Sequence, residues 1–226
     1  VACYERAKAF GFSIVLPMST SFAALMLGMG EADKVLSLLS GYGSMYGKYD
    51  TFYKYQYYFT PSYMDAAASL INYWNLGSDD ILARVGFPSR AYGGGTDSII
   101  EKLAMDRGFE FVTSIPWEVP ILDYSKLCYS RQQCDVIFNG MTQMLIDANV
   151  THVFILGWGT DFTQAALRGA LGAIENTSNI GNIWWNSLAL EEMGNETDGV
   201  LVPSWLSPSH APVPTSTLLN AMAQRE

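Results

Sequence analysis

Residues that could perform catalysis are scarce in this sequence. It contains two histidines, His152 and His210, and neither has a cysteine or a second histidine at the spacing of a metal site. No serine or cysteine stands beside a base in a recognisable nucleophile motif. The carboxylates are scattered, and the Glu191-Glu192 pair is typical of a solvated face. A carboxylate-only enzyme stays open, but we expect a non-enzymatic protein that needs no cofactor and no bound metal.

Two further residue patterns favour an exported protein. Cys128 and Cys134 lie six residues apart, and a disulfide between them would stabilise the fold by about 2–3 kcal/mol. The alternative is two unrelated free thiols, and Cys3 is left without a partner in this chain. Three Asn-x-Ser/Thr triplets, the acceptor motif for N-glycosylation, begin at Asn149, Asn176 and Asn195. With 10 Asn and 33 Ser or Thr among 226 residues, chance alone predicts about 1.5 such triplets.

Aromatic side chains are concentrated in one window. Eight of the 13 tyrosines fall between residues 42 and 63. Tyrosine combines a large apolar ring with a hydroxyl, so it suits both ligand pockets and protein interfaces. Tyr42 and Tyr46 lie among glycines after a predicted strand and are candidates for ligand contact. Residues 53–59 instead alternate as in a strand with one solvent-exposed face. An oligomer or assembly contact through this aromatic surface is the other interpretation.

Composition excludes several kinds of partner. The chain is 49% hydrophobic and 15% charged, with a net charge of −9 and a pI near 4.6. Such an acidic chain is a poor nucleic-acid binder and lacks a polybasic patch for anionic lipids. No stretch approaches the ~20 apolar residues of a membrane span. A membrane anchor would therefore lie outside this chain.

These residues are positioned by alternating strands and helices. The pattern predicts strands at 13–16, 34–39, 81–87, 109–115, 152–156, 180–185 and 199–202, and helices at 3–10, 22–29, 62–76, 96–107, 135–148 and 161–174. The Ser62/Asp65 pair is a capping signal and Gly108 a helix stop. Strands alternating with helices of this length predict βαβ units with parallel sheets.

Several of these stretches, in this order, carry a family resemblance. They are the strand–turn–Ser helix of 13–21, the small-residue loop of 35–44, the Tyr-Phe-Thr-Pro-Ser segment of 57–65, the Ala-Tyr-Gly turn within 81–95, the strand and helix start of 147–162, and the crossover strand of 199–202. The chain resembles the type I periplasmic-binding-protein family, which includes branched-chain amino-acid binding proteins of ABC transporters and the ligand-binding regions of natriuretic-peptide-type receptors. It departs at Leu16, where Gly is usual, and at Thr60, where Arg is usual.

The resemblance implies an α/β fold of two Rossmann-like lobes that close as a clamshell. Lobe 1 would span 1–77, lobe 2 78–199, and 200–226 would cross back to lobe 1. The family has more chain before Cys3 and after Glu226, so we expect an incomplete chain. The ligand would lie at the carboxyl ends of strands. The implied ligand-binding residues are Ser19, Ser21, Ser40, Tyr42, Ser44, Tyr92, Trp158 and Asp161.

The implied roles suit a small molecule such as an amino acid. Ser19 and Ser21 at a helix N-terminus favour a carboxylate, although simple helix capping is the alternative. Asp161 could oppose an ammonium group, and Tyr92 and Trp158 could cover an apolar part. We expect an extracellular, cell-surface or periplasmic ligand-binding domain, receptor-like or solute-binding. The alternative is a structural or assembly module that has lost its ligand.

Overall fold

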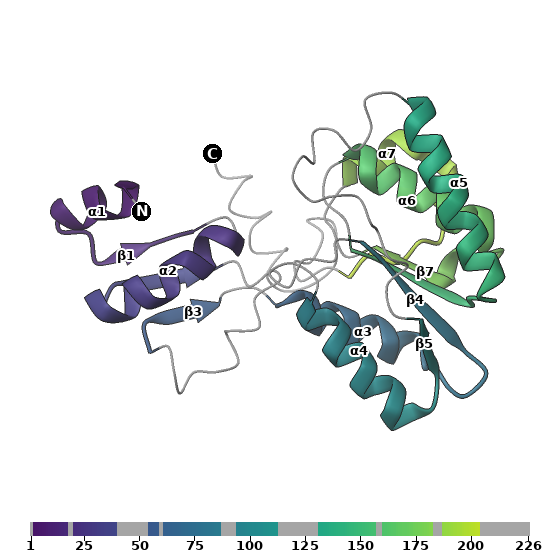
Figure 1. Cartoon of the computed structure of the whole chain (residues 1–226), viewed down its shortest axis with the longest axis horizontal. Helices are drawn as coiled ribbons and strands as arrows, with labels where there is room; N and C mark the ends of the chain where they lie inside the picture. The colour runs from purple at the N-terminus through teal and green to yellow at the C-terminus, as the bar shows by residue number, and fades with distance from the viewer. Residues whose placement is uncertain are drawn as a thin grey trace, which may run out of the picture.

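The computed structural model describes residues 2–17, 20–39, 54–58, 61–86, 94–112, 131–156, 160–182 and 187–203. These residues form two separate parallel sheets with helices packed on them (Figure 1). The first sheet has the strand order β1 (Ile14–Val15), β2 (Leu36–Leu39), β3 (Gln56–Tyr58). The second has the order β5 (Glu110–Val112), β4 (Ile81–Gly86), β6 (His152–Leu156), β7 (Ile180–Asn182). The expected α/β class with parallel sheets is confirmed.

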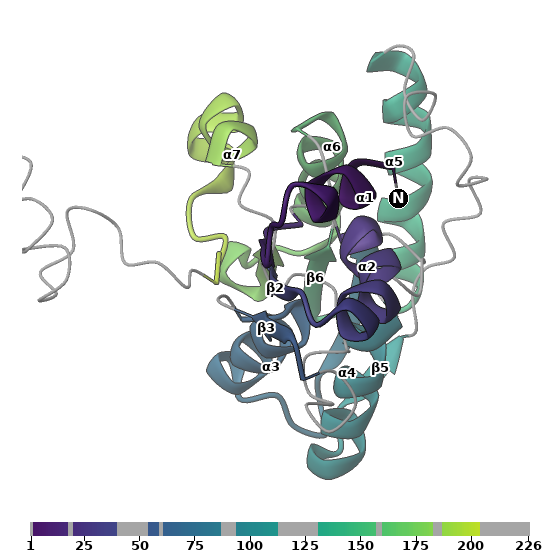
Figure 2. The ribbon, with the colours of Figure 1, turned by 90° about the vertical axis from the view of Figure 1, so that its left-hand side faces the viewer.

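Helices α1 (Ala2–Ala9) and α2 (Thr20–Asp33) belong to the first sheet (Figure 2). Met26 of α2 packs on Val35 and on Tyr4 of α1 to form a small core. The Tyr4 hydroxyl donates to Asp33 Oδ2 at 2.9 Å, and Lys8 Nζ lies 2.5 Å from Asp33 Oδ1. Burial and this hydrogen bond raise the pKa of Tyr4 to about 12, and the Lys8 ammonium lowers the pKa of Asp33. These contacts hold α1 against the end of α2.

Among the described residues, the opposite face of the first sheet is apolar and partly exposed to solvent. The strand register places Ile14 beside Leu36, and Leu38 beside Tyr57, on this one face. Ile14 is 48% exposed and Tyr57 is 57% exposed. Parallel sheets normally have helices on both faces, but in the part of the chain described here α2 covers only one.

The second sheet is covered on both faces, as Figure 1 shows. Helices α3 (Tyr63–Trp74) and α4 (Gly94–Arg107) pack on Leu82, Phe154 and Leu156. Helices α5 (Arg131–Asp147) and α6 (Thr160–Ala173) pack on the other face, against Val85 and Ile155. The short helix α7 (Ser187–Met193) contacts α6. The near-continuous apolar strands predicted from the sequence are therefore buried on both sides.

Helix α3 lies on the second sheet, although the expected lobe boundary at residues 77 and 78 would place it in lobe 1. Its residues Leu70 and Trp74 approach Gly181 of β7 so closely that a Cβ there would lie 2.6 Å from Leu70 Cδ1. Trp74 Nε1 also donates to the Ser178 carbonyl at 2.8 Å. The division of the chain into lobes stays a prediction, but the described contacts of α3 are with elements of the second sheet.

Local signals were reliable where they were strong. The capping box predicted for α3 is confirmed, because the Ser62 side chain accepts from Asp65 N while Asp65 Oδ2 accepts from Ser62 N at 2.9 Å. Gly108 ends α4 with φ 87° and donates its N–H to the Ala104 carbonyl. The strand predicted at 199–202 is wrong in extent, since it forms only a single bridge between Gly181 and Leu201. Helix α7 and the 3₁₀ turns η3 (Thr177–Asn179) and η4 (Gly194–Thr197) were not predicted.

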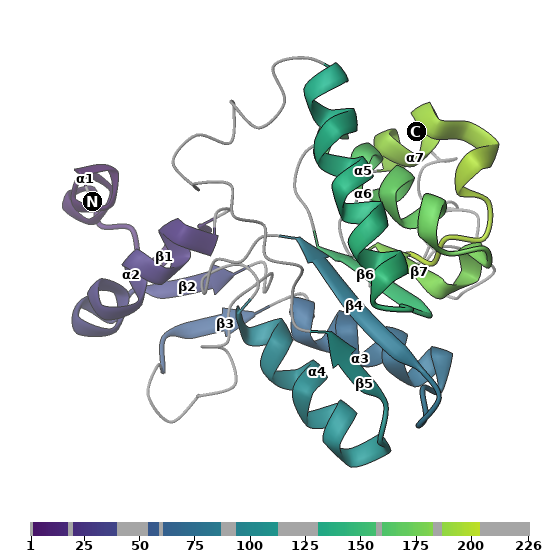
Figure 3. The ribbon, with the colours of Figure 1, turned by 45° about the vertical axis from the view of Figure 1, so that its right-hand side comes forward.

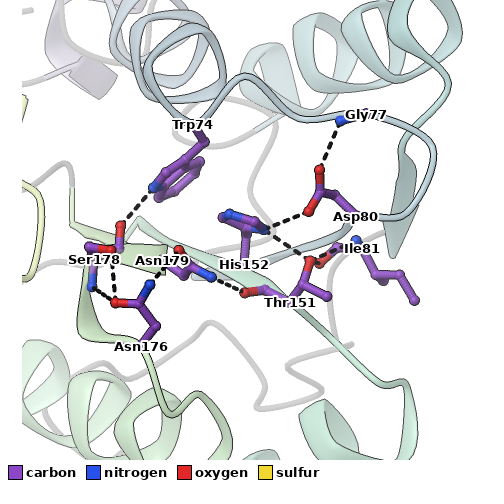
Figure 4. Close-up of polar contacts among 9 residues, drawn as sticks. All are labelled: Trp74, Gly77, Asp80, Ile81, Thr151, His152, Asn176, Ser178 and Asn179. Atoms are coloured by element: carbon purple, nitrogen blue, oxygen red, sulfur yellow. Dashed lines mark hydrogen bonds and ion pairs between the residues drawn. The ribbon is translucent and has the colours of Figure 1, made fainter.

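A polar network joins the amino ends of β4, β6 and β7 (Figure 4). Thr151 Oγ1 accepts from Ile81 N at 2.8 Å, and Asn179 Nδ2 donates to the Thr151 carbonyl at 3.1 Å. His152 lies between the Trp74 ring, 5.2 Å away between centroids, and Asp80, whose oxygen is 3.6 Å from Nδ1. The network ties the link between α3 and β4 to the starts of β6 and β7.

Gly86 is required where β4 ends. Its φ is 153°, and a Cβ there would lie 1.9 Å from the carbonyl oxygen of Leu156 on β6. We predict that Gly86→Ala lowers the free energy of unfolding by at least about 2 kcal/mol, because the backbone must move. Gly140→Ala is the control: it lies exposed in α5 with open space around it and should be neutral or stabilising. Chemical denaturation tests both, and equal midpoints for Gly86→Ala and wild type would contradict the prediction.

His152 should make stability depend on pH. Burial lowers the pKa of His152 below its ordinary value of 6.5, and nearby Asp80 only partly opposes this. The unfolded chain therefore binds a proton at a higher pH than the folded chain. Stability should be complete above about pH 6.5 and fall as the pH decreases towards the folded pKa. Urea unfolding across this range should show a weaker dependence of stability on pH in His152→Gln than in the wild type. A pH dependence of stability in His152→Gln equal to that of the wild type would refute this prediction.

Candidate ligand-binding edge

The carboxyl ends of both sheets point towards the middle of the molecule (Figures 1 and 3). Helices α2, α4 and α6 each begin a few residues after β1, β4 and β6 end. Parallel topology therefore collects three helix N-termini near strand ends. Unpaired N–H groups and the helix dipole make such N-termini favourable for anionic groups. This edge is the candidate functional site.

All eight predicted ligand residues come after strand carboxyl ends in the chain. Ser21 lies on α2 and Asp161 on the first turn of α6, by backbone position. The other six lie outside the described residues: Ser19, Ser40, Tyr42, Ser44, Tyr92 and Trp158. In chain order these residues follow β1, β2, β4 and β6. Their use in binding stays a prediction.

Sequence reasoning missed an ion pair beside this edge. Arg84 of β4 is 1% exposed, and it forms a two-pronged pair with Asp97 in the first turn of α4. Arg84 Nε donates to Asp97 Oδ1, and Nη2 donates to Oδ2 at 2.9 Å. A charge buried in a strand needs such a partner. The pair holds the first turn of α4 against the last residues of β4. In sequence, Arg84 and Asp97 lie on either side of the segment that contains Tyr92. A single arginine within the apolar run Ile81–Gly86 was the available signal.

The remaining sequence candidates lie elsewhere. Asn149, Asn176 and Asn195 are exposed, and Cys3 is an exposed free thiol. Cys128 lies outside the described residues and Cys134 is on α5, so the disulfide stays a prediction.

Neither a metal site nor a membrane span is found in the described residues. No three His, Cys, Asp or Glu side chains among them lie close enough together to hold a metal ion. Within the same ranges, no helix has both the length and the apolar character needed to cross a membrane.

Comparison with known proteins gave matches at the level of structure. No family model and no curated protein matches the sequence. A structure titled as an ABC transporter permease from the Pseudomonas fluorescens group superposes with a TM-score of 0.70 at 20% identity, over 94% of this chain and 49% of its own. A second match is the leucine-, isoleucine-, valine-, threonine- and alanine-binding protein of Brucella ovis in a closed conformation. It superposes with a TM-score of 0.69 at 16% identity, over 98% of this chain and 55% of its own.

A third match has a different stated ligand. The fatty acid ABC transporter substrate-binding protein of Thermomonospora curvata gives a TM-score of 0.64 at 14% identity, over 94% of this chain and 51% of its own. These names are those of binding proteins and a transporter component. This chain spans about half the length of each of the three. The two parallel sheets and these superpositions together show that the chain has part of the type I periplasmic-binding-protein fold.

Proposed function

We propose that this chain is the ligand-binding part of an extracytoplasmic protein that closes around a small molecule such as an amino acid. The observation that carries the proposal is the edge itself: every predicted ligand residue follows the carboxyl end of a parallel strand. In open α/β sheets, ligands bind outside these strand ends. The protein is non-enzymatic and acts by hinge closure. The names of the matched structures support a solute-binding role.

The proposed site has complementary groups for a zwitterion. Ser19 and Ser21, at the start of α2, hold the carboxylate with the helix N–H groups. Asp161, in the first turn of α6, opposes the ammonium group. Tyr92 and Trp158 cover the apolar side chain, and Ser40, Tyr42 and Ser44 line the edge after β2. The Arg84–Asp97 pair supports this assignment, because it anchors both ends of the segment that carries Tyr92.

The open apolar face of the first sheet favours a second candidate function. Its exposed Ile14 and Tyr57 would suit a structural or assembly module that has lost its ligand. Under this alternative the aromatic segment 42–63 also forms the interface.

A ligand panel separates the two functions. We predict that at least one of leucine, isoleucine, valine, threonine, alanine and octanoate raises the melting temperature of the purified protein. At a ligand concentration 100 times Kd, the gain is about 2.7 kcal/mol, or roughly 5–10 °C for a chain of this size. D-Leucine is the control for stereospecificity. If no ligand of the panel raises the melting temperature of the folded protein, the result favours the assembly module.

Asp161 should discriminate an amino acid from its desamino analogue. We predict that Asp161→Asn weakens binding of the amino acid that responds in the panel by about 10–100-fold, since a charged hydrogen bond is lost. Binding of the matching carboxylic acid without the ammonium group should change little. Asp147→Asn is the control, because Asp147 lies exposed at the end of α5. Calorimetry measures the affinity of the wild type and both variants for the two ligands. Equal weakening of the binding of both ligands by Asp161→Asn would rule out this role.

A further inference from the structure

The second sheet has two ends with different connections. Because β4, β5, β6 and β7 are parallel, every link from a helix into a strand lies at their amino ends (Figure 3). These links follow α3, α4, α5 and α6, and a last one runs from α7 to the bridge at Leu201. We call these five links the amino-end rim. It lies at the opposite end of the strands from the candidate ligand edge.

All three Asn-x-Ser/Thr triplets lie on the amino-end rim. Asn149 follows α5 with φ 50°, Asn176 precedes η3 after α6, and Asn195 lies in η4 after α7. Each of the three side chains is exposed. None of the triplets falls in a link at the carboxyl ends of the strands.

We propose that Asn149, Asn176 and Asn195 carry N-linked glycans, so that the amino-end rim is a sugar-covered face. In this modification Nδ2 forms a bond to C1 of an oligosaccharide, and the bond from C1 to a lipid pyrophosphate donor breaks. Nδ2 loses one proton as the pyrophosphate leaves. The inference rests on the extracytoplasmic placement proposed above, but not on the identity of the ligand.

The side-chain geometry is compatible with glycans in the folded protein. Asn176 uses its Oδ1, which glycosylation leaves in place, to accept hydrogen bonds from Ser178 N at 3.2 Å and Ser178 Oγ at 2.8 Å. Its Nδ2 has only a long contact of 3.5 Å to Asn179 Oδ1 at the surface. An attached sugar therefore leaves the cap of η3 intact.

A structural role offers the competing explanation, since asparagine is favoured at helix ends. Asn75 provides the matched control. It is exposed, ends α3 with φ 54° and lies on the same rim, but the residue two positions later is Gly77. Gly77 has open space around a Cβ and is not among the glycines with positive φ. Gly77→Thr thus creates a fourth triplet at an equivalent place.

The test is translation of the full chain, behind a cleavable secretion signal, into eukaryotic microsomes. Glycans are counted by the mass that an N-glycosidase removes. We expect three on the wild type, two on each of Asn149→Gln, Asn176→Gln and Asn195→Gln, none on the triple variant, and four on Gly77→Thr. Fewer than three occupied sites on the wild type would overturn the proposal, most directly if Gly77→Thr still gains one.

A second measurement separates this proposal from the ligand-binding one. The ligand panel is repeated on protein before and after enzymatic removal of the glycans. We expect the same rise in melting temperature in both, because the rim and the ligand edge lie at opposite ends of the strands. A rise that appears only after removal would contradict this separation. An absence of glycans would leave the ligand result unchanged, so the two proposals can fail independently.

Discussion

The buried charge of Arg84 is the main constraint on the second sheet's part of the candidate ligand edge, because it requires a partner at the start of α4. β4 is an interior strand, and Arg84 lies beside Phe154 of β6 with almost no contact with water. Removing Asp97 would leave the Arg84 charge buried without this carboxylate, which is destabilising. Asp97 must therefore remain in place, and with it the first turn of α4. Gly86 then lets β4 run against the Leu156 backbone. Together they fix the end of β4 and the start of α4, the described elements that flank residues 87–93.

The two ends of the second sheet are specialised differently. The carboxyl ends carry helix N-termini, which leave N–H groups available to a ligand. The amino ends carry the network of Thr151, His152, Asp80 and Asn179. The polar groups of this network contact one another and the neighbouring backbone. A rigid scaffold with binding residues on its loops is the usual arrangement in α/β proteins.

Periodicity and capping chemistry made much of the fold predictable. The strand 152–156 and the start of α3 follow directly from an apolar run and from Ser62 and Asp65. Tertiary relations were harder: chain order does not reveal that α3 leaves the first sheet, and Arg84 gives no hint of a partner 13 residues later. The candidate ligand residues follow strand ends by topology alone, since most of them lie outside the described ranges. Their types, rather than their geometry, support the assignment.

One face of the first sheet has no helix on it among the described residues, and this has a consequence for behaviour in solution. Four apolar side chains from three adjacent strands share it, with Ile14, Leu36, Leu38 and Tyr57 in register. Excluded salts such as sulfate strengthen the burial of apolar surface. A chain with this face would adsorb to phenyl chromatography media and salt out early, despite a net charge of −9. Its solubility would then be governed by one patch rather than by overall charge.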